Sequence, residues 1–261
     1  MSEDGIIEVT DIQMDIGTYS GQILKGIPHG NGDLRFSDGR RYIGEFVNGM
    51  FNGEGEYILE DGSRIVGTFM NNVIHGKGTL TAPDGGRYHG DFVNGNFNGE
   101  GELYYSNGSR YSGQFVNGQF CGLGKFQLPD GTVYSGEFQN NQMHGNGELI
   151  TPDGTKYLGS FMNGDKNGKG KLFTPDGSIL IGDFINGEPN GKGQLYLPNG
   201  KLCYDGDFKD SEFCGRGKLY SDGKLCYEGE FMNSEPHGDG IAYADDGSLI
   251  RGRFDRGEYI G

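Results

Sequence analysis

Histidine and cysteine are the residues of this chain best suited to hold a metal ion, and their spacing decides whether they can. Four of the five histidines recur at equivalent places in a repeating unit of 23 residues: His29, His75, His144 and His237. The closest two are two units apart, roughly 19 Å in a sheet with strands about 4.8 Å apart. A zinc–nitrogen bond measures only about 2 Å. We therefore expect no metal site and interpret these histidines as turn residues that bond nearby backbone.

The chain has four cysteines, and no two of them form a Cys-x-x-Cys motif: Cys121, Cys203, Cys214 and Cys226. Cys203 and Cys226 are equivalent residues of adjacent units, so we expect them about 10 Å apart. A disulfide needs Cα atoms within about 7 Å. We predict reduced thiols, which are typical of a cytosolic protein.

Acidic residues recur at one position of the unit and are the remaining groups that could do acid–base chemistry. They are Glu45, Asp91, Glu137, Asp183, Asp207 and Glu230. A ladder with this spacing is usually a solvated face of a sheet. No nucleophile–base pair and no phosphate-binding loop accompanies it. The sequence therefore predicts no enzyme and no cofactor.

All these residues belong to one repeated stretch, whose second copy runs from Tyr42 to Arg64 (YIGEFVNGMFNGEGEYILEDGSR). Successive copies start 23 residues apart, with one gap of 24 residues between Leu180 and Tyr204. A fixed period of 20 to 50 residues is the signature of a repeat architecture. We expect ten full units and a partial eleventh over residues 19–261, and we number each unit from its first residue. Residues 1–18 form a separate acidic segment.

The residue pattern inside each unit predicts two strands. Positions 1 to 5 read Tyr-x-Gly-x-Phe and positions 12 to 16 read Gly-x-Gly-x-Leu, so side chains alternate between two faces. Asp-Gly or Asn-Gly at positions 20 and 21 suits a tight turn, and so does a second turn at positions 6 to 8. Each unit is therefore expected to be one hairpin. The predicted fold is all-β, an elongated single-layer antiparallel meander of hairpins about 100 Å long.

Glycine recurs at five places in the unit, one of which, position 8, is Gly in only seven units. These places account for 49 of the 52 glycines, so glycine here is structural and not a flexible linker. Glycine weakens a strand unless another group approaches its backbone closely. We expect the bare rows at positions 3 and 14 to leave space for the flat ring of a Tyr or Phe.

The motif Tyr-x-Gly-x-Phe-x-x-Gly-x-x-(His/Asn)-Gly-x-Gly resembles the MORN repeat, the membrane occupation and recognition nexus. The resemblance covers residues 19–261, although this chain has no Trp where the family often carries one at position 5. It implies an interaction module. Such repeats accompany catalytic domains in certain lipid kinases and lysine methyltransferases, and fill whole chains in radial-spoke heads and protist cytoskeletal structures. Only 18 residues lie outside the repeats, so the resemblance implies a cytoplasmic scaffold of a cytoskeleton or ciliary axoneme that docks protein partners.

The charge of the chain bears on its partners. Net charge is −15, which disfavours nucleic acid and anionic lipid surfaces. No apolar run approaches 18 residues, and the acidic N-terminus lacks the basic region of a signal peptide. A peripheral membrane or phospholipid tether is nevertheless the alternative function, because a local basic patch is compatible with this composition.

Three segments depart from the regular pattern. In residues 1–18, Ile12, Met14 and Ile16 alternate with polar residues, and we interpret them as a strand that caps the first hairpin; a partner-binding strand is the alternative. Units 8 and 9 each carry an extra residue in Gly-Lys-Leu-Cys-Tyr, which predicts a bulge near residues 200–226. The unfinished last unit leaves an open strand edge, which predicts a homodimer through the C-terminal edge or a frayed end.

Position 10 distinguishes some units from others. It is apolar in units 2 to 6, which carry Phe51, Ile74, Phe97, Phe120 and Met143. It is Lys166, Pro189 and Pro236 in units 7, 8 and 10. One interpretation is that these side chains complete the packing of the aromatic face. The other is that the five apolar residues form a partner-binding line, since contiguous exposed apolar patches mark interfaces.

Overall fold

The computed structural model describes residues 5–244 and 246–261. These residues form strands joined by turns and contain no helix, in agreement with the predicted all-β hairpin architecture. They divide into two compact units, Met1–Pro129 and Asp130–Gly261. The described parts of the chain contain no helix of the length and hydropathy that a membrane crossing requires.

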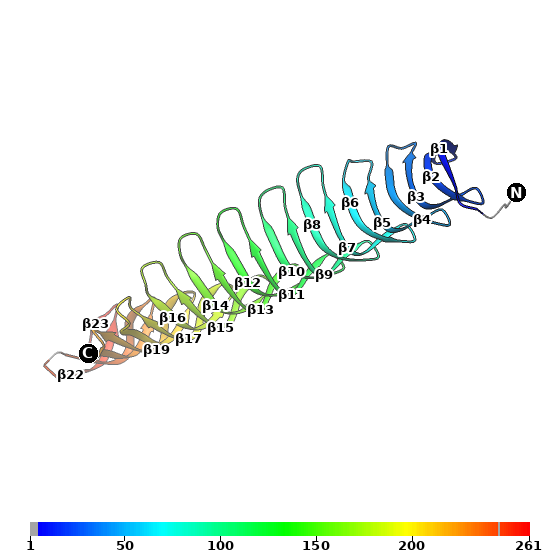
Figure 1. Cartoon of the computed structure of the whole chain (residues 1–261). Helices are drawn as coiled ribbons and strands as arrows, with labels where there is room; N and C mark the ends of the chain where they lie inside the picture. Colours follow the sequence, from blue (N-terminus) through cyan, green and yellow to red (C-terminus); the bar gives the residue numbers. More distant parts are fainter. Residues whose placement is uncertain (1–4, 245) are drawn as a thin grey trace. The chain divides into compact units, whose positions relative to one another are not determined.

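In the first unit, consecutive strands pair antiparallel from β1 to β11, as Figure 1 shows. Their bounds are β1 Ile7–Met14, β2 Gly17–Leu24, β3 Ile27–Phe36, β4 Arg41–Val47, β5 Met50–Ile58, β6 Arg64–Met70, β7 Val73–Thr81, β8 Arg87–Val93, β9 Asn96–Tyr104, β10 Arg110–Val116 and β11 Gln119–Gln127.

The second unit repeats this antiparallel order from β12 to β23. Its strands are β12 Val133–Gln139, β13 Gln142–Ile150, β14 Lys156–Met162, β15 Asp165–Phe173, β16 Ile179–Ile185, β17 Glu188–Tyr196, β18 Leu202–Lys209, β19 Glu212–Ser221, β20 Lys224–Met232, β21 Glu235–Tyr243, β22 Leu249–Asp255 and β23 Glu258–Tyr259. The predicted length of about 100 Å for the whole array stays a prediction.

Both predicted turns are present. At the hairpin tip, Asn48 and Gly49 have φ values of 51° and 78°, as a type I′ turn requires. In the closing turn, the Gly62 amide donates to the Leu59 carbonyl at 3.0 Å. The Asp61 carboxylate accepts the Ser63 amide at 2.8 Å, which fixes that turn.

The tyrosine at position 1 lies across the two glycine rows, as predicted. A Cβ atom added to Gly101 would sit 2.6 Å from both Cε2 and Oη of Tyr88, and one added to Gly90 would sit 2.6 Å from the Gly101 Cα. Any side chain at either position would therefore displace the ring or separate the strands. The Tyr88 hydroxyl donates to the Asp91 carbonyl at 2.8 Å, so the buried phenol keeps a hydrogen-bond partner.

The phenylalanine at position 5 closes the packing around each ring. Tyr88 meets Phe92 of its own repeat at 5.1 Å and Phe115 of the next repeat at 5.2 Å between ring centroids, both edge to face. These three side chains are at most 1% exposed. The core is therefore one face of the sheet, built by contacts within a repeat and with its successor.

In the ten full repeats, the position-5 residue follows a break in strand register, which the sequence pattern did not predict. In β4 and β5 the register shifts between Gly44 and Phe46. The acidic side chain at position 4 fills this bulge: Glu137 Oε1 accepts the Asn146 amide at 2.9 Å. The acids that we interpreted as a solvated ladder thus also satisfy backbone donors that the bulge leaves without a strand partner.

Two of the irregular segments are as the sequence indicates. The register shifts between Leu195 and Tyr196 and again between Leu219 and Tyr220, where the extra residues of units 8 and 9 lie. In residues 1–18, β1 pairs with β2 and ends at Met14. The division of the chain into domains at residues 1–18 and 19–261 stays a prediction.

Gly101→Val should destabilise the protein by about 3 kcal/mol, because a branched side chain cannot coexist with the Tyr88 ring. Gly86→Val is the matched control. Gly86 has an ordinary negative φ, its nearest neighbour would be the Asp84 side chain at 3.1 Å, and Thr132 and Thr155 hold the equivalent position. Urea unfolding measures both. Equal stability of the two variants would contradict ring packing on glycine.

Burial makes the sheet sensitive to alkali. Desolvation raises the pKa of Tyr88, Tyr134 and Tyr157 from 10.0 to about 12. The neutral phenol is favoured in the folded state, so this stabilisation is complete below pH 10 and is lost as pH rises through 12. We expect tyrosinate absorbance and loss of sheet circular dichroism to rise together in that window. Tyrosinate formation complete near pH 10 with an intact sheet would contradict this.

Candidate functional site

The five residues predicted to contact a partner through position 10 lie on the aromatic face. Phe51, Ile74 and Phe120 are at most 7% exposed, and Phe97 and Met143 are partly buried. Phe51 stacks on Tyr42 at 3.7 Å between centroids with the planes 6° apart. The packing interpretation accounts for where these side chains lie. A role in partner binding stays a prediction.

The differing residue types at position 10 have a structural explanation. In repeat 7, the Lys166 ammonium lies 5.4 Å from the centroid of the Tyr157 ring, a cation–π contact. Burial lowers the pKa of Lys166. In repeat 8, Pro189 is buried opposite Phe184. A ring, a lysine stem and a proline can each cover the same surface, so a structural role does not require the same residue type in every repeat.

Exposed apolar side chains lie instead at the hairpin tips, at positions 6 and 9, which flank each type I′ turn. The second unit carries three of them at position 6, Met162, Ile185 and Met232, and the first unit carries seven at the two positions. We call this set the first-unit tip row: Ile27, Val47, Met50, Met70, Val73, Val93 and Val116. Its members are 37–50% exposed. They alternate with the buried residues at positions 5 and 10 and so point away from the aromatic face.

Successive hairpin tips of the first unit lie close together. A Cβ atom added to Gly49 would lie 3.3 Å from Cγ2 of Ile27, and one added to Gly95 would lie 3.5 Å from Cγ1 of Val73. The backbone joins the same tips, since the Gly49 amide donates to the Pro28 carbonyl at 2.9 Å. The row therefore runs along five hairpins whose tips are joined by the backbone.

Charge separates the tips of the two units. Among positions 6 to 9 of the five first-unit hairpins, the only charged residue is Lys25. The same positions in the second unit carry seven acids and two bases, and Asp165, Glu188, Glu212 and Glu235 hold position 9. This contrast in charge between the tips of the two units is already present in the sequence, at positions 6 and 9 of the repeat.

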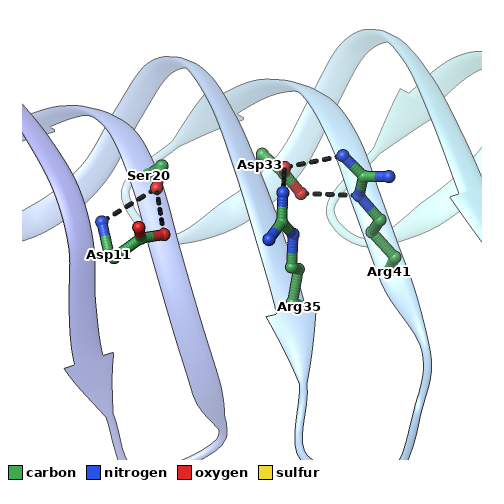
Figure 2. Close-up of polar contacts among 5 residues, drawn as sticks. All are labelled: Asp11, Ser20, Asp33, Arg35 and Arg41. Carbon is green, nitrogen blue, oxygen red and sulfur yellow. Dashed lines mark hydrogen bonds and ion pairs between the residues drawn. The ribbon is translucent and has the colours of Figure 1, made fainter.

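The face opposite the aromatic rings is dominated by ion pairs between strands. Figure 2 shows Asp33 on β3 held by Arg41 on β4, through contacts of 2.8 and 2.9 Å, and by Arg35 at 3.1 Å. The Arg41 guanidinium holds the pKa of Asp33 below its usual value. Further along, Lys169 pairs with Asp183 at 2.9 Å. Most of these charges already have partners, so the face is less suited to a charged ligand than composition suggests.

A shallow groove of about 900 Å³ lies on this face in the second unit, over glycines of β18 to β21. Four bases and three acids line it: Lys192, Arg216, Lys218, Arg251, Asp205, Glu228 and Asp239. Tyr220, which lies at one of the two bulges, also lines the groove. Its nearly balanced charge does not select one ligand class.

The histidines and cysteines remain dispersed. No group of three or more metal-binding side chains occurs among residues 5–244 and 246–261. All four cysteines are free. At the position of these histidines in other repeats, Asn98 Oδ1 accepts the Asn117 amide of the next hairpin tip at 3.3 Å. The predicted contact with nearby backbone thus exists for asparagine, both between hairpins and within one, where Asn98 Nδ2 donates to the Asn96 carbonyl at 3.3 Å.

A family model for the MORN repeat matches ten segments: residues 19–40, 42–64, 66–87, 88–110, 111–133, 134–156, 157–179, 181–201, 204–224 and 227–249. These are the ten full units predicted from the sequence, so the family resemblance is confirmed. Comparison with curated proteins finds no match.

Solved structures of centriolar proteins are distantly similar. The TCP domain of Drosophila melanogaster SAS-4 (dCPAP), in complex with a proline-rich motif of Ana2 (dSTIL), is 14% identical with a TM-score of 0.37, covering 65% of this chain and 85% of that chain. The CPAP G-box domain is 18% identical with a TM-score of 0.38, covering 66% and 96%. The Danio rerio CPAP TCP10 domain, in complex with a STIL peptide, is 18% identical with a TM-score of 0.32, covering 78% and 96%. Likenesses this distant carry no functional argument.

The packing role of position 10 predicts an asymmetry between two charged substitutions. Phe51→Asp should cost about 3 kcal/mol or more, because it removes a buried stacked ring and leaves a carboxylate on the aromatic face. Phe51→Lys should cost clearly less, since Lys166 occupies the same place over Tyr157. Val47→Asp, on the exposed tip of the same hairpin, is the control and should change the melting temperature little. Equal costs for all three would contradict the packing interpretation.

Proposed function

The chain belongs to the MORN-repeat family, and we propose that it is a non-enzymatic scaffold that docks proteins along the hairpin tips of its first unit. The observation that carries the proposal is the first-unit tip row. Seven side chains that are 37–50% exposed present on the order of 500 Å² of surface along adjacent hairpin tips, a size at which apolar patches on soluble proteins usually mark binding sites.

The architecture suits this role. Each repeat is held by its own ring and by the phenylalanine of the next repeat, so the tips contribute little to the core and are free to carry binding residues. The rigid type I′ turns fix their spacing. A partner therefore meets a preorganised surface and loses little affinity to ordering of the scaffold.

Assignment to a cytoskeletal or ciliary structure rests on analogy with chains of the family that consist of such repeats. We propose a cytoplasmic scaffold of this kind, with a radial-spoke-like axonemal component as the specific form. The analogy concerns the family and not a site on this chain.

The alternative function, a peripheral membrane tether, would use the same tip row. The charges argue against it, because Lys25 is the one base at positions 6 to 9 of the first-unit tips, and each nearby base supplies about 1 kcal/mol. Sedimentation with vesicles of phosphatidylcholine containing phosphatidylserine or a phosphoinositide tests this directly. Protein pelleted with either vesicle, and released by substitution of the tip row, would favour the tether over the scaffold.

Affinity purification from the native cell, followed by mass spectrometry, tests the scaffold. The variant Val47→Lys/Val93→Lys/Val116→Lys places three charges on the first-unit tip row and should lose the proteins that the unmodified chain recovers. The matched control is Met162→Lys/Ile185→Lys/Met232→Lys, at the same position of second-unit hairpins and equally exposed. It should retain them.

Both variants should remain folded by circular dichroism, because every changed side chain is exposed. Unchanged recovery by the first-unit variant, or equal losses in the two variants, would overturn docking along the first-unit tip row.

A further inference from the structure

We propose that the first-unit tip row binds a second copy of the same chain, tip to tip and antiparallel, to form a weak two-fold dimer. This inference rests on the proposed function, since it names one occupant of the same docking surface. It is distinct from the dimer through the C-terminal edge that the sequence suggested, because it uses hairpin tips and not strand pairing. Three features of the tip row argue for it.

The first feature is charge. A net charge of −15 makes most approaches of two copies repulsive. The second-unit tips are acidic, so they would repel their equivalents. The first-unit tips present Val, Met, Ile, Asn and Gly, with Lys25 alone charged. This edge is therefore where two copies can approach without opposing like charges.

The second feature is spacing. The tip row repeats once per hairpin, about every 9.6 Å. A helix with an apolar residue at every seventh position repeats about every 10.5 Å, so it would lose register by about 4 Å along five hairpins. A second copy of the chain has the same spacing between its hairpin tips, because its sequence is the same. In an antiparallel dimer, side chains of one row fit between those of the other along the whole contact.

The third feature is area. Two tip rows would together bury about 1,000 Å², the lower bound for a specific interface. Sheet twist turns the outer hairpins away from a two-fold axis, which concentrates contact on the middle hairpin, β6 and β7. The dimer should consequently be weak, with a dissociation constant on the order of 10 µM. Met70 and Val73 lie at its centre.

Sedimentation equilibrium tests the inference, with the purified chain at concentrations from about one-tenth to ten times the expected dissociation constant. The unmodified chain should pass from monomer to dimer. Met70→Lys/Val73→Lys should remain monomeric throughout, because it places four like charges at the two-fold axis. Met162→Lys/Met232→Lys, which has the same number of new charges on equally exposed second-unit tips, should dimerise like the unmodified chain. Circular dichroism confirms that both variants are folded.

Two results would overturn the inference. One is a chain that stays monomeric across the range. The other is a dimer that Met70→Lys/Val73→Lys leaves intact, as pairing through β22 and β23 would give. Either result would leave docking of other proteins on the tip row standing if the purification from cells still depends on that row. Loss of that dependence alone would instead refute the proposed function.

Discussion

The fold depends on a tyrosine ring that lies flat on two glycines of adjacent strands. Because neither Gly90 nor Gly101 has a side chain, the Tyr88 ring reaches the backbone and its hydroxyl reaches the Asp91 carbonyl. The position-10 side chain covers the outer face of the ring, and two phenylalanines close its edges. A single layer of sheet thereby buries large aromatic side chains without a second layer.

This arrangement explains which positions are free to vary. Position 1 accepts Ile65 or Leu180, and there the phenylalanine of the next repeat approaches the glycine instead: Phe92 lies 3.0 Å from a Cβ built on Gly78, and Phe208 lies 2.9 Å from one built on Gly193. Position 10 accepts any side chain that covers the ring. Positions 6 and 9 contribute almost nothing to the core, so the apolar side chains there are available to a partner, as we propose for the first unit.

Much of this fold could be predicted from the sequence, because each rule acts within one repeat. The alternation of apolar and polar residues predicts the strands, and Asn48-Gly49 and Asp61-Gly62 predict the turns. Glycine at positions 3 and 14 predicts the packing of the rings against the backbone. The bulge between Gly44 and Phe46 could not be predicted, since it depends on which residues of β4 and β5 pair on either side of it. For the same reason, the backbone contacts of the position-4 acids could not be predicted, although Glu45 and Glu137 are exposed as expected. Position 10 remained ambiguous because alternation alone does not say whether a residue near a turn folds back over its neighbour.

Ring-current shifts of the glycine Hα protons test the central claim most directly. In the assigned NMR spectrum, position-14 glycines that lie under a tyrosine, such as Gly101 and Gly124, should resonate well upfield of the turn glycines at position 21. Gly78 and Gly193, which face a phenylalanine edge, should lack that shift. Tyr88→Leu should abolish it at Gly101 and leave Gly124 unchanged. Unshifted Gly101 protons in the folded, unmodified chain would contradict the account.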